Sequence, residues 1–258
     1  MSQGSVLLYA VLPYVAIAVF AVGTVWRYRR DQYGWGARST QFLESRVLRY
    51  GSTIFHLGVL AAIGGHVLGI LIPRSWTAAV GLPDGAYHVI AVIGGLAAGG
   101  AVVAGFLILV YRRLRFPRVR VTTTRMDEAT FAMLGFGILT GILATTTNLG
   151  DAVHYRETVG PYFRQVLVLD PKPELMTGGG VDLIFQIHVV AVWFLYALWP
   201  FSRLVHVWSI PVDFLRRSPI LYRSRAPRPR AGRRAPLPEP RAPTEGGPTG
   251  GPARSSAD

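Results

Sequence analysis

The sequence contains no cysteine. This absence excludes disulfide bonds, covalent attachment of a c-type haem and iron–sulfur clusters bound by this chain. Charged residues are scarce as well, at 16% of the 258 residues, and lysine occurs once, as Lys172. Between its apolar segments the chain has no room for a sizeable soluble domain. The apolar segments must therefore carry the fold.

The apolar residues form five runs of about 20 residues each, the length that crosses a hydrocarbon layer roughly 30 Å thick. The runs cover residues 6–26, 53–72, 87–111, 129–147 and 183–208. The sequence therefore predicts an all-α integral membrane bundle of five transmembrane helices over residues 1–224. Since Arg27 and further basic residues follow the first run, we expect it to be retained as a span and not cleaved as a signal peptide.

Basic residues are distributed unevenly between the predicted loops. Residues 27–49 and 112–125 hold six arginines each and the segment after Trp208 holds ten, whereas the other loops hold four basic residues in all. Because arginine and lysine concentrate on the cytoplasmic side of membrane proteins, we predict the N-terminus outside and the C-terminus in the cytoplasm. This accounts for the net charge of +13 without nucleic acid. Residues 225–258 are rich in proline, arginine and glycine and are expected to be a disordered cytoplasmic tail.

Four of the six histidines lie in the second and fifth runs, where ionisable side chains are costly and therefore indicate function. The predicted topology places His56 near the inner face, and His66 about 15 Å further out by helical rise. The fifth run points the other way, so His188 lies outside and His206 inside. Facing helices thus supply two imidazole pairs, as two b-type haems require. We predict an electron carrier in which His56 and His206 bind an inner haem b, and His66 and His188 an outer haem b.

Helical arithmetic leaves one mismatch in this arrangement. His188 and His206 are 18 residues apart, which is about five turns and places them on one face of a regular helix. Their helical rise is roughly 27 Å, against about 15 Å between His56 and His66. Tilted helices, tilted haems or a kink at Pro200 would each absorb the difference. Arg203 is expected either to reach the interface or to bind a haem carboxylate.

Glycines accompany the histidines and have two explanations. A flat macrocycle lies against a helix only where side chains are absent, but small residues also permit close helix packing in membranes. The outer loop 148–182 mixes apolar and charged residues and is expected to form an interfacial helix or a lid. The glycines are Gly58, Gly64, Gly65 and Gly69 in the second run, and Gly94, Gly95, Gly99, Gly100 and Gly105 in the third.

The two remaining histidines are His88 and His154. His88 opens the third run at the outer interface, level with the predicted outer haem. If a quinol donates its electrons to the outer haem, it also loses two protons at this interface. Histidine is the residue type that exchanges protons near neutral pH. His88 is therefore the candidate proton acceptor, with an interfacial aromatic-belt position as the alternative. His154 is expected to be a solvated loop residue.

Residues 12–225 resemble the gamma subunit of membrane-bound respiratory nitrate reductase, a cytochrome b family. The resemblance is carried by LPYVAIAVFAVGTVWRYRRDQYGW, YGSTIFHLGVLAAIGGHVLGILIP, PRVRVTTTR, FQIHVVAVWFLYALWPFSRLVHVWSIPV and the closing YRSR. The four family ligand positions match as His56, His66, His188 and His206. Two departures are the tail, which is longer than usual, and His88, which stands near the start of the third helix where family members often carry a lysine.

The resemblance implies a multi-pass protein of the cell inner (plasma) membrane, working within a quinol:nitrate oxidoreductase. Menaquinol or ubiquinol would be oxidised near the outer haem, and electrons would pass to a cytoplasmic iron–sulfur subunit and a molybdenum subunit that reduces nitrate. Two alternatives remain open: a cytochrome b subunit of a related sulfite or heterodisulfide-type reductase complex, and a transporter whose histidines bind metal ions or relay protons.

Overall fold

The computed structural model describes residues 2–31, 35–36, 38–150 and 153–208. Five helices in this part of the chain are long and apolar enough to cross a membrane. They are Gln3–Arg30, Arg46–Leu71, Asp84–Arg115, Arg125–Thr147 and Leu183–Phe201. The prediction of an all-helical protein with five candidate spans is confirmed for the described residues, with each of the first four helices extending beyond its apolar run at one or both ends. The predicted tail, residues 225–258, lies outside them.

Three of the five spans change their helical type along their length. The first comprises α1 (Gln3–Val6), η1 (Leu7–Val11) and α2 (Leu12–Arg30), and the second α3 (Arg46–His66) and η3 (Val67–Leu71). Both η1 and η3 are single π-helical turns, which occur often at functional sites. The third and fourth spans are the uninterrupted helices α5 (Asp84–Arg115) and α7 (Arg125–Thr147).

The fifth apolar run is not one regular helix to Trp208. Helix α10 (Leu183–Leu198) gives way to the 3-10 turn η4 (Trp199–Phe201), then Ser202 adopts an extended conformation before a second 3-10 segment, η5 (Arg203–Trp208). Pro200 has no N–H to donate to the carbonyl four residues earlier, which ends the α-helical ladder. The kink at Pro200 is therefore present, and His188 and His206 do not share one helical face.

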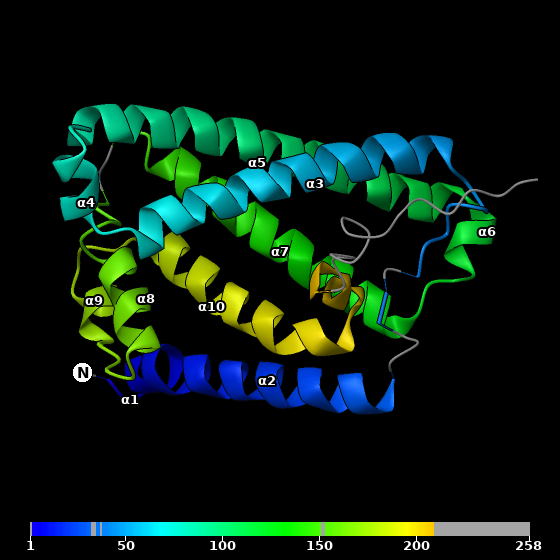
Figure 1. The fold of residues 1–258 in the computed structure, drawn as a ribbon, viewed down its shortest axis with the longest axis horizontal. Coiled ribbons are helices and arrows are strands. Elements are labelled where there is room, and N and C mark those ends of the chain that lie inside the picture. The colour runs from blue at the N-terminus through cyan, green and yellow to red at the C-terminus, as the bar shows by residue number, and fades with distance from the viewer. Residues whose placement is uncertain (1, 32–34, 37, 151–152, 209–258) are drawn as a thin grey trace, which may run out of the picture. The chain divides into compact units, whose positions relative to one another are not determined.

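The spans pack in a definite order, α2 against α10, α10 against α7, α7 against α5, and α5 against α3 (Figure 1). Helix α3 packs most closely against α5, through glycines. A Cβ at Gly58 would lie 2.7 Å from the Val102 backbone nitrogen, and one at Gly105 would lie 2.4 Å from that of Phe55. For Gly58 and Gly105, close helix packing is the correct explanation.

Short helices lie at both ends of the spans. Helices α4 (Arg74–Ala79), α8 (Val159–Leu167) and α9 (Glu174–Thr177) lie at one end, here termed the α8 end, as Figure 1 shows. Helix α6 (Pro117–Arg120) and the loop that precedes α3 lie at the other, here termed the arginine-rich end. The arginine-rich end carries the loops on which the topology prediction depends.

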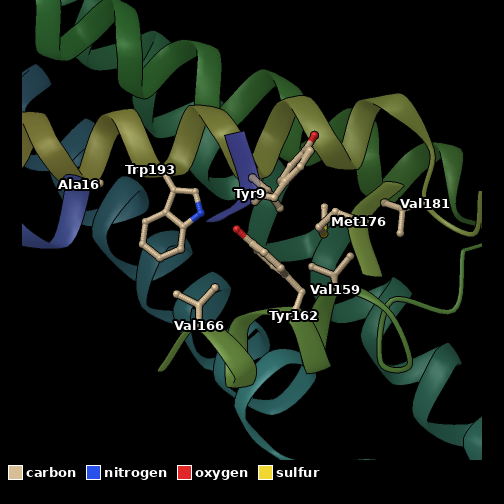
Figure 2. Close-up of a cluster of buried hydrophobic side chains, with 9 residues drawn as sticks. Tyr9, Ala16, Val159, Tyr162, Val166, Met176, Val181 and Trp193 are labelled. Atoms are coloured by element: carbon tan, nitrogen blue, oxygen red, sulfur yellow. The ribbon is translucent and has the colours of Figure 1, made fainter. Parts of the chain in front are cut away.

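The loop predicted to be an interfacial helix or a lid forms α8, whose inner face is fully buried. Tyr162 has no exposed surface and contacts Tyr9 edge to face, with ring centroids 6.1 Å apart. Both tyrosines belong to a cluster of buried side chains that also contains Trp193 and Met176. Figure 2 shows this cluster between α8, the first span and α10. Burial raises the pKa of Tyr162 above its ordinary value, so its hydroxyl stays neutral. Helix α8 thus closes the α8 end over the first and fifth spans.

A buried ion pair fixes the arginine-rich end of α5. The Arg112 side chain is 4% exposed, and its Nε donates to Glu44 Oε2 over 2.6 Å. Burial opposes ionisation of Glu44, but hydrogen bonds from the Val47 N–H, the Arg112 guanidinium and the Leu48 N–H outweigh it and hold its pKa below the ordinary value. The same carboxylate therefore caps the start of α3 and ties it to α5.

Candidate cofactor site

The structure brings the four span histidines together in the two predicted pairs. The ring centroids of His56 and His206 lie 5.9 Å apart, and those of His66 and His188 lie 6.2 Å apart. Two imidazoles that bind one metal ion from opposite sides have centroids about 6 Å apart, because each metal–nitrogen bond is about 2 Å long. Both separations therefore suit one metal centre between each pair.

Every one of these rings has its Nδ1 atom in a hydrogen bond. His56 Nδ1 lies 2.7 Å from the Ser52 carbonyl oxygen, His66 Nδ1 2.7 Å from that of Ala62, and His206 Nδ1 2.6 Å from that of Arg203. A carbonyl oxygen can only accept, so Nδ1 carries the proton in these three rings and Nε2 carries the lone pair. Hydrogen bonds to the ring nitrogen that does not bind the metal orient histidines that do bind metals.

In His188 the acceptor for the Nδ1 proton is a side chain and not a backbone carbonyl. The Thr140 hydroxyl donates to the Phe136 carbonyl over 2.9 Å, which leaves its oxygen to accept from His188 Nδ1 at 3.0 Å. Gly141 makes the approach possible, since a Cβ there would lie 2.9 Å from the His188 ring. Helix α7 is therefore the support of this ligand, which the sequence did not indicate because no local pattern links Thr140 to His188.

The surroundings of the two pairs fit flat macrocycles. Helices α3 and α10 face each other without packing extensively, unlike the other neighbouring spans. A Cβ at Gly64, Gly65 or the buried Gly137 would meet no atom within 4 Å. Open space beside a buried glycine such as Gly137 is what a ring lying against the helix requires. Gly64 and Gly65 are exposed, as are His56 and His66, within an apolar span. The residues present thus fit two haems.

The remaining glycines divide between the two explanations. In the third span, a Cβ at Gly95 would touch Thr145 and one at Gly99 would touch Ile142, so these residues mediate packing against α7. Gly94 and Gly100 meet no atom within 4 Å. In the second span, Gly69 lies against the Tyr155 ring and the Tyr87 hydroxyl. Close packing is therefore the larger role of the third-span glycines.

A site for a bare metal ion is not found in the described part of the chain. No group of three or more histidine, cysteine, aspartate or glutamate side chains could hold an ion there. Protein sites for transition metals such as zinc use three or four side-chain ligands. Two imidazoles suffice for a haem because the porphyrin supplies the other ligands.

Tyr87 and His88 lie at the α8 end in different surroundings. His88 Nε2 lies 3.3 Å from the Leu149 carbonyl oxygen, beside the loop that follows α7. Tyr87 is buried, with the Arg156 guanidinium 3.8 Å above its ring, and its hydroxyl lies against Gly69, one turn beyond His66. The Tyr87 hydroxyl therefore contacts the second span, and the role of His88 stays a prediction.

A model of the nitrate reductase gamma subunit family matches residues 5–225. The chain belongs to this family. It is 42% identical over 221 residues to the nitrate reductase gamma chain of Bacillus subtilis, covering 85% of this chain and 98% of that one. It is 35% identical over 219 residues to the respiratory nitrate reductase 1 gamma chain of Escherichia coli, covering 84% and 96%.

A further relative shows the same family segment within a longer protein. The nitrate reductase-like protein NarX of Mycobacterium tuberculosis (strain ATCC 25618 / H37Rv) is 47% identical over 222 residues, which is 85% of this chain. The chain spans about a third of the length of NarX, 34%. Similarity to the gamma chains therefore covers nearly their whole length, whereas similarity to NarX covers one part of it.

Proposed function

We propose that this chain is the di-haem cytochrome b subunit of a membrane-bound nitrate reductase. The observation that carries the proposal is the pairing of four histidines at two levels, each with its Nδ1 hydrogen-bonded. His56 and His206 would hold the haem at the arginine-rich end, and His66 and His188 the haem at the α8 end. Family membership supports the assembly with other nitrate reductase subunits.

The protein's own side chains determine what the bound groups can do. A bound haem supplies one-electron oxidation and reduction. With two histidines for each haem, His56 with His206 and His66 with His188, no position on the metal would be left for a substrate, and nitrate would be reduced in a partner subunit. Helices α5 and α7 pack against α3 and α10. Each histidine pair therefore stays at a fixed distance from the α8 end and from the arginine-rich end.

The direction of electron flow follows from the charge distribution. The arginine-rich end is proposed to face the cytoplasm, where iron–sulfur and molybdenum partner subunits would bind, with the chain in the cell inner membrane. Menaquinol or ubiquinol would be oxidised at the α8 end, on the outer side, and release protons there. His88 is the proposed proton acceptor, because histidine exchanges protons near neutral pH and His88 lies at this end.

Membranes that contain the assembled complex, with and without this chain, test the proposal. With the chain, a reduced quinol analogue should drive nitrate reduction, and a water-soluble artificial donor should drive it as well. Without the chain, the artificial donor should remain effective while the quinol-driven rate falls to background. An equal quinol-driven rate in both preparations contradicts the proposal. Reduction of sulfite instead of nitrate by the purified complex would favour the related reductase.

A further inference from the structure

His206, which is proposed to bind the inner haem, lies beyond the break in the fifth span. It is therefore outside the regular helix α10. Residues 199–208 form two 3-10 segments separated by the extended Ser202, with Val205 fully buried. A metal ligand needs a fixed orientation. Contacts from other helices must therefore determine where His206 points.

Arg27, from the first span, donates to two backbone carbonyls at the break. Its Nη1 donates to the Pro200 carbonyl over 2.6 Å and to the Ser202 carbonyl over 2.8 Å, and the residue is 5% exposed. One turn earlier, Gly23 permits the close approach, since a Cβ there would lie 3.0 Å from Pro200 and Phe201 side-chain atoms. A buried arginine near the end of a membrane span is costly unless it has such acceptors. Arg27 therefore holds the start of the segment against α2.

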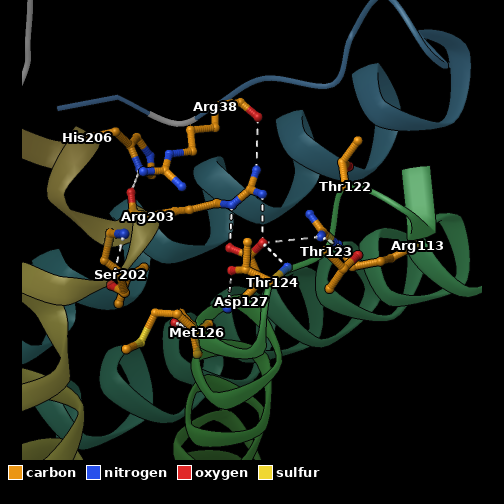
Figure 3. Close-up of polar contacts among 12 residues, drawn as sticks. Arg38, Arg113, Thr122, Thr123, Thr124, Met126, Asp127, Ser202, Arg203 and His206 are labelled. Carbon is orange, nitrogen blue, oxygen red and sulfur yellow. Dashed lines mark hydrogen bonds and ion pairs between the residues drawn. The ribbon is translucent and has the colours of Figure 1, made fainter. Parts of the chain in front are cut away.

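Arg203 binds the segment to the start of α7, as Figure 3 shows. Its Nε lies 2.5 Å from Asp127 Oδ1 and its Nη2 2.7 Å from Asp127 Oδ2, a two-armed contact with fixed geometry. Asp127 is 4% exposed and is itself fixed by a capping box with Thr124. Arg203 Nη1 also donates to the Arg38 carbonyl. Arg203 thus links η5 to α7 and to the loop that contains Arg38.

The contacts of Arg203 lead directly to the ligand. Its side chain is held by Asp127, while its backbone carbonyl accepts from His206 Nδ1 over 2.6 Å. We infer that Asp127, Arg203 and Arg27 are positioning residues that set the orientation of the His206 imidazole, and that the Asp127–Arg203 contact is the main one. The inference rests on the proposed function, because it assigns these residues to the inner haem.

The orientation of the ring has its own spectroscopic readout. The planes of His56 and His206 differ by 68°, and those of His66 and His188 by 39°. The low-spin ferric EPR signal of a bis-histidine haem depends on the angle between its two imidazole planes, so a rotation of His206 shifts one signal and leaves the other. A residue that merely stabilised the fold would not move one signal selectively while both haems remain bound.

Asp127→Asn in the full-length chain, within the assembled complex, is the test. The carboxamide keeps the size of the side chain but removes the charge that holds Arg203. We expect a shifted EPR signal and midpoint potential of the inner haem, with the outer haem at wild-type values. Arg203→Gln should shift the same signal, and the double variant should shift it no further than either single one, because both variants break the Asp127–Arg203 contact. Glu128→Gln, which removes the exposed neighbouring charge, is the matched control and should change neither haem.

The inner EPR signal in these variants decides whether the inference holds. An unchanged inner signal in Asp127→Asn, or an equal change in Glu128→Gln, overturns the inference. If Asp127→Asn does not accumulate in membranes, Arg203→Lys carries the test, since it keeps the charge but loses the two-armed contact. An unchanged inner signal in that variant overturns the inference as well. If the wild-type complex contains no haem in this chain, the proposed function itself fails, which distinguishes the two.

Discussion

His66→Ala is expected to remove the haem at the α8 end and to abolish quinol-driven nitrate reduction. Alanine supplies no nitrogen ligand, so only His188 would remain to hold a haem at a site where two imidazoles face each other. The haem content should fall from two to one per chain, and the haem held by His56 and His206 should remain. Nitrate reduction driven by an artificial donor that acts on the soluble subunits should be unchanged. Haem quantification and the two activity assays measure these effects.

The control for this variant is His154→Ala, since His154 lies in the loop before α8 and is exposed. It should retain both haems and both activities. If His66→Ala kept quinol-driven activity, the proposed route of electrons from the α8 end would be wrong. If it kept two haems, the pairing of His66 with His188 as ligands would be wrong.

Gly105→Ala is expected to disrupt the packing of α3 against α5. The added Cβ would lie 2.4 Å from the backbone nitrogen of Phe55 and 2.6 Å from its Cα, and backbone atoms cannot move aside without moving the helix. Overpacking of this kind costs roughly 1–3 kcal/mol and occasionally more. Since Phe55 precedes His56, the inner pair should be disturbed as well. Lower thermal stability of the purified complex and loss of the inner haem are the expected results.

Gly85→Ala on the same helix is the matched control. A Cβ at Gly85 would meet no atom within 4 Å, so stability and haem content should equal those of the wild type. A Gly105→Ala protein with wild-type melting temperature and two haems would show that α3 and α5 are less tightly packed than the structure indicates.

The five spans and the histidine pairing could be predicted from the sequence because both depend on long-range regularities. Apolar runs long enough to cross a membrane can be recognised directly in the sequence. Arginine-rich loops alternate with arginine-poor ones, which predicts the direction in which each span crosses. Once the second and fifth spans point in opposite senses, His56 must lie level with His206, and His66 with His188. The structure shows both pairs at the separations that this argument requires.

The supports of the ligands could not be predicted, because they are tertiary contacts between residues far apart in the chain. Pro200 signals a kink, but not that Arg27 would bind two backbone carbonyls there. The Thr124 and Asp127 pair predicts a helix start, but not the contact with Arg203. Likewise, treating residues 183–208 as one regular helix gave His188 and His206 a common face, which the 3-10 segments abolish.

The most direct test of the account is the haem content of the purified full-length chain. A dithionite-reduced minus oxidised spectrum identifies a b-type haem, and extraction of the haem gives its amount relative to protein. The account predicts a b-type spectrum with two haems per polypeptide, one for each histidine pair. A colourless chain, expressed with ample haem supply, would contradict it.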